Sequence, residues 1–249
     1  MAVKAVEQGA TIADLRRRIA AVNPRGTRAA PEPTRPPQHD TAPTRLALAL
    51  PEHLQPAFPT AGLPQGSMVE LCGARGPAVS IIATVTRAGG SVAIIDTPTF
   101  GLLAAHEQGA DLTRIALVPD SGDDPIAVIS VLTEGMDLIV WTPGRTTCTP
   151  SVERGLAARL RTKQSTLIAL GPGLRRPDYR LEVNIANYRG ITTGHGNLSG
   201  IETTIRSSGR NLAPTRTRVC LSRGDRILKA SVVPADVHTL GERRRQAGT

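Results

Sequence analysis

The residues whose types and spacing most suggest chemistry follow a short apolar run, and they match a triphosphate-binding loop only in part. Such a loop reads G-x-x-x-x-G-K-[ST]: backbone N–H groups hold phosphate oxygens, the lysine neutralises charge and the hydroxyl binds magnesium. Counted from Gly73, its last three positions are Ala78, Val79 and Ser80. Only the first glycine and the hydroxyl remain, and Pro77 has no N–H to offer. The segment predicts an ordinary strand-to-helix turn, with Ser80 on the first helical turn and no nucleotide cofactor.

Arg75 leaves an alternative open, because its guanidinium could replace the missing lysine charge from within the loop. An active ATPase that uses Arg75 and Ser80 in a rebuilt loop is therefore the alternative to an inactive protein, and saturable ATP binding would favour it. The acidic cluster at residues 120–124 could bind magnesium, but Asp124 precedes Pro125 and is better explained as a helix cap. The five histidines and three widely spaced cysteines have no metal-ligand or disulfide spacing. We expect no metal site.

Alternating apolar runs must position this loop. After residue 178 the runs become shorter, and residues 194–200 read as a hairpin loop, which predicts an antiparallel meander that extends the sheet. Before it, strands alternate with helices, which predicts an α/β fold with a mainly parallel sheet and helices on both faces. The expected strands are 68–72, 91–96, 114–120, 137–142, 165–171, 179–191, 200–208, 215–223 and 226–233, and the expected helices are 78–89, 100–109, 124–135 and 150–163.

The two ends of the chain differ from its middle. Formal charge is +3 over residues 1–44, zero over 45–201 and +6 over 202–249. Residues 11–22 carry one apolar helical stripe, and the segment after them is rich in proline and poor in large apolar side chains. We expect the helix to pack in cis or on a neighbouring subunit. The predicted organisation is an N-terminal amphipathic helix (1–23), a proline-rich linker (24–44), an α/β core (45–202) and a basic C-terminal β extension with a tail (203–249).

The basic C-terminal region indicates either an acidic partner, which is nucleic acid or protein, or equally a solvated surface without a partner. With one Trp, two Tyr and two Phe in the chain, we expect no platform that stacks successive bases. The chain has no apolar run long enough to span a bilayer and no signal-peptide core, so we expect a cytoplasmic protein without a membrane partner. The candidate partner- or DNA-binding residues form a distributed surface: Arg206, Arg210, Arg216, Arg218, Arg243, Arg244 and Arg245.

The loop and its neighbouring strands resemble the core of RecA-type recombinases over roughly residues 66–170, from "GSMVELCGARG" through "GMDLIVWTPG". In that family the second strand ends I-D-x-E, and its glutamate activates the attacking water. Here Asp96 is kept, but Pro98 stands at the glutamate position. Thr142 stands where the family has its magnesium-linked aspartate. The resemblance implies a RecA-like fold in which the loop lysine, the base and the metal-side acid of ATP hydrolysis are all replaced, and therefore a protein that is not an enzyme.

Within that family the chain is most similar to the actinobacterial ImuA'-type accessory proteins of the translesion-synthesis assembly. The degenerate loop, the proline-rich linker and the basic end carry this resemblance. It implies a non-catalytic protein of the SOS response that binds an ImuB-type, Y-family polymerase-like adaptor and, indirectly, an error-prone C-family DNA polymerase, with association with the nucleoid after DNA damage. Direct DNA contact and self-association through the N-terminal helix stay open. The alternatives are an active RecA-like ATPase and a DNA-binding recombination or repair factor.

Overall fold

The computed structural model describes residues 47–58, 60, 62–144, 148–191, 198–210, 212–223 and 228–233. The predicted N-terminal helix within residues 1–23, the linker at 24–44 and Arg243, Arg244 and Arg245 lie outside the described residues. No helix in the described part of the chain is long and apolar enough to span a membrane.

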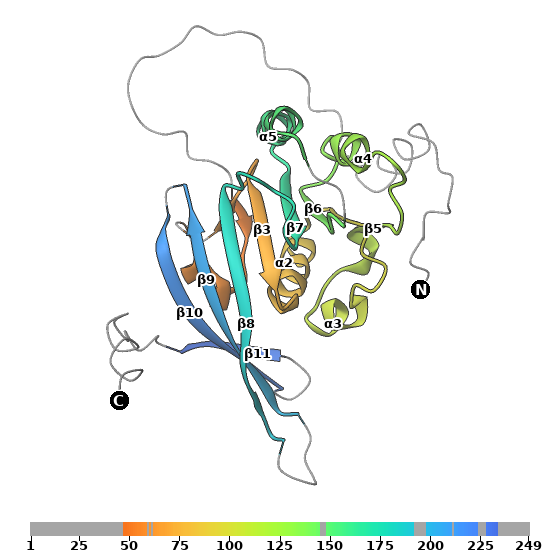
Figure 1. The fold of residues 1–249 in the computed structure, drawn as a ribbon. Helices are drawn as coiled ribbons and strands as arrows, with labels where there is room; N and C mark the ends of the chain where they lie inside the picture. Colours follow the sequence, from red (N-terminus) through yellow and green to blue (C-terminus); the bar gives the residue numbers. More distant parts are fainter. Residues whose placement is uncertain are drawn as a thin grey trace, which may run out of the picture.

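The described residues form a nine-stranded sheet with the order β11-β10-β9-β8-β3-β7-β6-β4-β5 (Figure 1). The strands from β8 to β5 pair in parallel, and β8 to β11 pair antiparallel. The α/β class with a mostly parallel sheet and an antiparallel extension is therefore confirmed. The strands are β3 (Met68–Gly73), β4 (Val92–Ile95), β5 (Ile115–Val118), β6 (Leu138–Trp141), β7 (Thr166–Leu170), β8 (Tyr179–Arg189), β9 (Gly200–Gly209), β10 (Leu212–Arg223) and β11 (Leu228–Val233).

Strand β8 differs from the prediction. The sequence predicted that everything after residue 178 is an antiparallel meander, but β8 runs parallel to β3, with Val69 opposite Tyr179 and Gly73 opposite Val183. The meander begins only with β9, which pairs antiparallel with β8. Residue 202, the expected end of the core, falls within β9, so the sheet continues through that position without a break.

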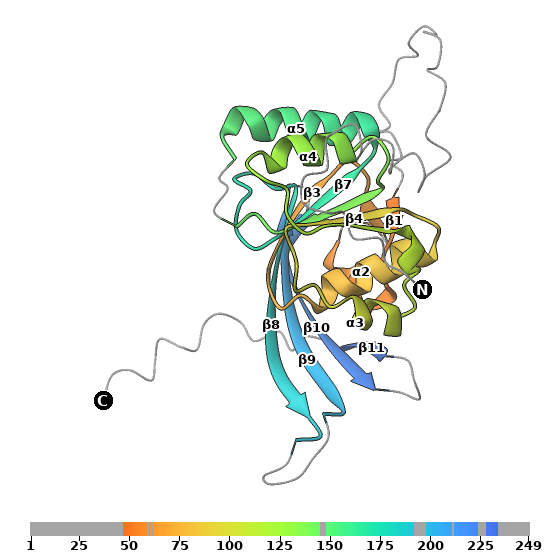
Figure 2. The same ribbon diagram turned by 90° about the vertical axis from the view of Figure 1, so that its right-hand side faces the viewer.

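Helices cover the parallel part of the sheet on both faces (Figure 2). Helices α2 (Gly76–Arg87) and α3 (Leu102–Glu107) lie on one face, and α4 (Pro125–Leu132) and α5 (Pro150–Lys163) on the other. The predicted cap is confirmed, because the Asp124 carboxylate accepts a hydrogen bond from the Ala127 N–H at 3.0 Å. Helix α5 matches its predicted range residue for residue and begins after Thr149, whose hydroxyl accepts from the Val152 N–H.

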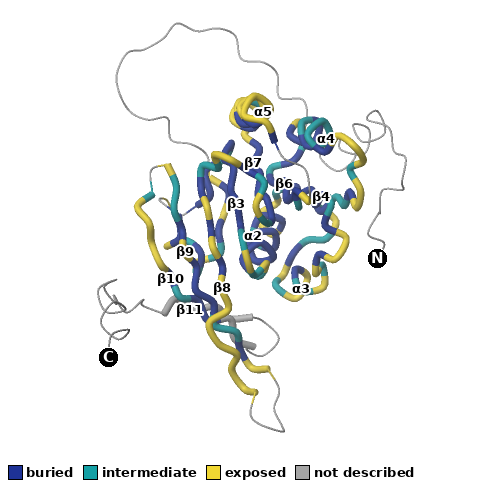
Figure 3. The backbone as a smooth tube through the Cα atoms, viewed as in Figure 1, coloured by how far each residue is buried: buried dark blue, intermediate teal, exposed yellow. Residues whose placement is uncertain are grey.

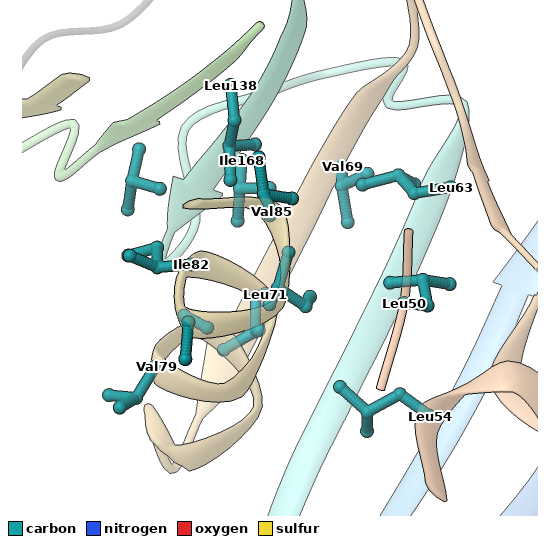
Figure 4. Packing of buried hydrophobic residues seen from close by; sticks show 14 of the residues in the cluster. Leu50, Leu54, Leu63, Val69, Leu71, Val79, Ile82, Val85, Leu138 and Ile168 are labelled. Carbon is teal, nitrogen blue, oxygen red and sulfur yellow. The ribbon is translucent and has the colours of Figure 1, made fainter. Parts of the chain in front are cut away.

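Two apolar clusters hold these layers together. On the α2 face, the helix buries Val79, Ile82 and Val85 against Leu71 and Ile168 of the sheet (Figure 4). On the opposite face, a second cluster contains Trp141 and residues of α4 and α5, including Ile129, Leu156 and Leu160. Both faces of β4, β6 and β7 are therefore buried, as their near-continuous apolar runs predict.

A short segment before β3 covers the α2 face of the antiparallel strands. It consists of β1 (Ala47–Ala49), the 3-10 helix η1 (Glu52–Ala57) and β2 (Gly62–Pro64), none of which the sequence predicted. Leu54 and Ala57 join the first cluster, and the ring of Phe58 meets that of Tyr179 edge-on at 5.7 Å. On the other face of β8, β9 and β10, no described helix covers the sheet (Figure 2).

The crossover from β7 to β8 has no helix and is fixed by buried carboxylates instead. Glu70 accepts the N–H groups of Gly173 and Leu174 at 3.3 and 3.2 Å, in the "GPGL" stretch. Glu153 accepts the next two backbone N–H groups, those of Arg175 and Arg176, at 3.3 and 2.8 Å. These bonds satisfy backbone donors that a helix would otherwise use. They also set where β8 begins.

Candidate functional site

The segment that begins like a phosphate loop is a tight turn between a strand and a helix, as predicted. Strand β3 ends at Gly73 and α2 begins at Gly76, so only two residues separate them. The N–H of Val79, at the lysine position, donates to the Arg75 carbonyl at 3.2 Å within the helix. Ser80 was expected on the first helical turn, but α2 starts earlier and places it on the second. Its buried hydroxyl donates to Gln108 Oε1 at 2.7 Å.

Gly73 is explained by strand packing. Its φ is +97°, and a Cβ there would lie 2.0 Å from the carbonyl oxygen of Val183 on β8. The next residue, Ala74, donates its N–H to the same oxygen at 3.0 Å. Only glycine permits this close approach with a left-handed backbone. The glycine that suggested a phosphate loop therefore has a structural role in joining β3 to β8.

Two threonines occupy the position between the carboxyl ends of β4 and β6. Thr97 and Thr142 share a hydrogen bond between their side-chain oxygens of 2.7 Å. Since the Thr97 hydroxyl also donates to the Ile95 carbonyl at 2.9 Å, the shared proton comes from Thr142. Thr142 was predicted to replace the metal-side acid, and its polar group is satisfied by a neutral neighbour. Pro98, at the position of the base, is exposed.

Asp96, the acid that the sequence keeps, holds the loop after β5. Its backbone is left-handed, with φ of 52°, and its carboxylate accepts from the Ser121 N–H at 2.8 Å and the Ser121 hydroxyl at 2.6 Å. The indole N–H of the fully buried Trp141 donates to it at 3.2 Å. The carboxylate is therefore engaged on several sides. Trp141 is a core residue packed on the α4 and α5 side.

The two residues of the alternative rebuilt loop lie in different surroundings. Arg75 is the exposed residue just before α2, whereas Ser80 is buried one turn further on and bonded to Gln108. The cationic group and the hydroxyl thus do not share an open space. Among the residues of the turn and the positions described above at Asp96, Pro98 and Thr142, only Arg75 carries a positive charge.

The predicted arginines of the C-terminal region lie on the antiparallel strands. Arg206 of β9 and Arg216 of β10 are exposed and directly opposite each other, and Arg218 is two residues further along β10. Arg210 is exposed in the turn after β9, where its N–H donates to the Asp178 carbonyl at 3.1 Å. In the described part of the chain, none of these four side chains has an ion-pair partner. We call Arg206, Arg216 and Arg218 the arginine face.

Arg180, which was not among the predicted site residues, lies at the edge of the arginine face. Its Nε contacts Glu70 Oε1 at 2.8 Å, and the Glu70 side chain is only 4% exposed. Position 180 falls in the segment of zero net charge, so charge counting passed over it. The alternation of exposed residues at 180, 182 and 184 was the signal that could have placed it on the polar face.

Cys72 lies beside the same ion pair. Its Sγ is 3.9 Å from Glu70 Oε1, and Glu182 is its neighbour on β8. Burial, together with Glu70, raises the pKa of the thiol above its usual range. The thiol is therefore protonated at neutral pH, which removes the reactive form.

A groove of about 1020 Å³ lies at the opposite edge of the sheet from the loop. It is lined by residues that precede strands, among them Ser91, Asp137 and Gln164, and by the C-terminal ends of α2, α4 and α5. None of the predicted site residues lines it. The hollow is thus separate from the turn at Gly73 and from the arginine face.

Known proteins give this arrangement a family. Residues 56–175 match the family described as MT3502 N-terminal domain, a range that runs from the end of η1 through the turn at Gly73 and past β7. The uncharacterized protein Rv3395c of Mycobacterium tuberculosis, strain H37Rv, is 42% identical over 164 residues, which cover 63% of this chain and 80% of that protein. With this identity over most of the relative's length, the chain belongs to the same family as the mycobacterial protein Rv3395c.

Proposed function

We propose that the chain is a non-catalytic, RecA-like accessory protein of damage-induced mutagenesis. In this role it binds an ImuB-type, polymerase-like adaptor and through it supports translesion synthesis by an error-prone C-family DNA polymerase. The strand order supports the proposal, because the turn at Gly73 follows the central strand β3, at the carboxyl edge where open α/β sheets bind nucleotides. The fold keeps the place of a nucleotide site without its reactive groups.

The observation that carries the proposal is the hydrogen bond between Thr97 and Thr142 at 2.7 Å. Hydrolysis of a triphosphate needs positive charge on the phosphates and a group that positions water. At the corresponding positions the chain has a buried valine, an exposed proline and two neutral hydroxyls bonded to each other. Such a site offers no stabilisation to developing negative charge. Function then depends on the surface.

The arginine face supports an acidic partner. Arg206 and Arg216 are like charges on directly opposite positions, an arrangement that costs stability in an isolated sheet. A partner carboxylate would relieve this repulsion. In the strand register, Glu182 of β8 is opposite Arg206 on the side away from Arg216. Its carboxylate is one negative charge beside the two arginines.

The test uses purified full-length chain and purified adaptor. We expect no ATP hydrolysis above background with single-stranded DNA, and measurable adaptor binding that the Arg206→Ser/Arg216→Ser variant weakens by about tenfold or more. Arg114→Ser, which changes a half-buried arginine paired with Asp111 at the opposite end of the sheet, is the control for loss of a positive charge away from the arginine face. Substitution is a cleaner test than deletion of residues 203–249, which would remove Ile205 and Val219 from the core. Adaptor binding that is absent in the unmodified protein would reject the proposal.

DNA-backbone binding is the second candidate, and the open arginine face favours it. Arginines without ion-pair partners in the described part of the chain could contact phosphates directly. In that case affinity for DNA would fall steeply with salt in the absence of any protein partner, and each lost phosphate contact would reduce the salt slope by about one. A flat salt dependence would leave the protein-binding proposal.

A further inference from the structure

The hairpin formed by β8 and β9 extends beyond the body of the protein and exposes apolar side chains. Figure 2 shows it projecting past α2 and α3, and its end is largely exposed (Figure 3). Exposed large hydrophobic residues are few in the described part of the chain, and four of the six lie on this hairpin. They are Ile185 at 44% exposure, Tyr188 at 49%, Ile191 at 60% and Leu198 at 43%. Such clustering marks an interaction surface.

A β-bulge keeps the apolar residues of β8 on one face. Ile185 is opposite Thr203, but the register then shifts, and Tyr188 is opposite Ile201. Without the extra residue, Tyr188 would lie on the polar face, three positions from Ile185, because side chains alternate along a strand. Bulges that re-aim a side chain are features of function more often than defects. The bulge therefore extends an apolar surface along the hairpin.

This surface continues the core and then loses its cover. Val183 and Ile205 on the same face are buried in the first cluster. Strand β3 ends opposite Val183, so the rest of β8 has no described strand on that side. An apolar, unpaired strand edge is a liability unless something covers it.

The charge around the hairpin indicates which kind of partner binds to it. Residues 179–223 contain seven arginines and two glutamates, with no lysine or aspartate. A second copy would bring the same excess positive charge to the contact, which opposes self-association through this surface. Nucleic acid satisfies the charge but not the aliphatic side chains, because bases stack on aromatic rings and Tyr188 is the one aromatic residue of the group.

We propose that the β8–β9 hairpin is the primary docking element for the adaptor, and that it inserts Ile185, Tyr188 and Leu198 into an apolar surface bordered by acidic side chains. This inference rests on the proposed function and names the partner's chemistry. The apolar residues supply affinity, and the arginines supply orientation and rate of encounter. The arginine face alone would give a weaker, salt-sensitive contact.

The experiment measures binding of the full-length chain to purified adaptor. We expect Ile185→Ser/Tyr188→Ser, and separately Leu198→Ser, to weaken binding by at least about tenfold. The control Asn184→Ser changes an exposed residue of the same strand that lies on the opposite face, and we expect affinity within about twofold of the unmodified chain. Circular dichroism and the urea midpoint check that each variant folds.

The outcomes separate this inference from the proposed function. If the unmodified chain binds the adaptor and both hairpin variants bind equally well, the docking element is wrong while the proposed function stands. Loss of self-association or of DNA binding in the hairpin variants, with adaptor binding intact, also overturns the inference. Failure of the unmodified chain to bind the adaptor overturns both. Selective loss in the hairpin variants, with the asparagine control intact, supports it.

Discussion

Thr97 and Thr142 join the carboxyl ends of β4 and β6 through a 2.7 Å hydrogen bond between their hydroxyl oxygens. In an open α/β sheet this edge is the usual place for a ligand and its acidic residues. Here the two side chains satisfy each other, and the neighbouring Asp96 carboxylate is taken by Ser121 and Trp141. The edge has become part of the structural framework.

Restoring the missing groups should therefore fail to restore the chemistry. We expect Val79→Lys/Thr142→Asp to bind no ATP with magnesium, because Val79 is 8% exposed and its N–H is already bonded within α2. A charge forced into this position should lower the free energy of unfolding by roughly 2–4 kcal/mol. Urea unfolding and an ATP titration measure both effects. Saturable ATP binding by the variant would contradict the interpretation of this edge as closed.

The second prediction isolates the contact between Gly73 and Val183. Gly73→Ala should lower the free energy of unfolding by about 3 kcal/mol or more, because the added Cβ would meet a backbone oxygen 2.0 Å away. Gly171→Ala is the matched control, since Gly171 has a similar φ of +103° with nothing within 4 Å. It should cost only about 1 kcal/mol of backbone strain. Equal losses in urea unfolding would mean that the close approach is relieved by movement of β8.

Local patterns predicted most of the elements of the parallel sheet. The range of α5 agrees with its apolar spacing and its Thr149 cap, and β3 is one residue longer than predicted. The short elements within residues 47–64 were not predicted, because their prolines and short apolar runs have neither a strand nor a helix period. The parallel pairing of β8 with β3 was not predicted either. Which strand lies beside β8 depends on the crossover fixed by Glu70 and Glu153, whose partners are distant in sequence.

The reactive residues that the site lacks were easier to predict than the contacts that it contains. The loop lysine is missing from the sequence, and Val79 is simply apolar. The ion pair of Glu70 with Arg180 joins residues 110 positions apart by number, and no local pattern indicates it. Ile185 follows the alternation of a strand with a buried face, and Tyr188 joins that face only through the bulge, yet both lie beyond the part of the sheet that the body covers. The exposure of these two side chains depends on where β3 ends, because β3 pairs with β8 only as far as Val183.

The third prediction concerns acid. His53 lies in η1, and burial lowers its pKa from 6.5 to about 4. Between these values the unfolded chain takes up a proton that the folded chain does not. The stability from the neutral imidazole is therefore full above pH 6.5 and falls as the pH drops towards 4. Allowing for partial contact with water, we expect His53→Gln to remove about 1–2 kcal/mol of this acid sensitivity.

Urea midpoints at pH 7.5 and 4.5 measure that difference. His106→Gln, which changes an exposed histidine of α3, is the control and should keep the acid sensitivity of the unmodified chain. If His53→Gln has the same pH dependence as the unmodified chain, then η1 of the unmodified chain stays packed on the sheet even when the imidazole of His53 is charged.

The last prediction tests the carboxylate that links β3, β8 and the crossover. Glu70 accepts from Arg180 at 2.8 Å and from two backbone N–H groups, those of Gly173 and Leu174. Glu70→Gln leaves the arginine without its charged partner and turns an amide N–H towards either the guanidinium or the backbone donors. Because Arg180 is 45% exposed and keeps contact with water, we expect a loss of about 2–3 kcal/mol in the free energy of unfolding.

The matched control is Glu134→Gln, because Glu134 pairs with Arg159 at the same distance of 2.8 Å but both side chains are exposed. Its loss in the free energy of unfolding should stay below about 1 kcal/mol. Equal losses would mean that burial of Glu70 adds nothing to the pair, and the crossover would then need another anchor.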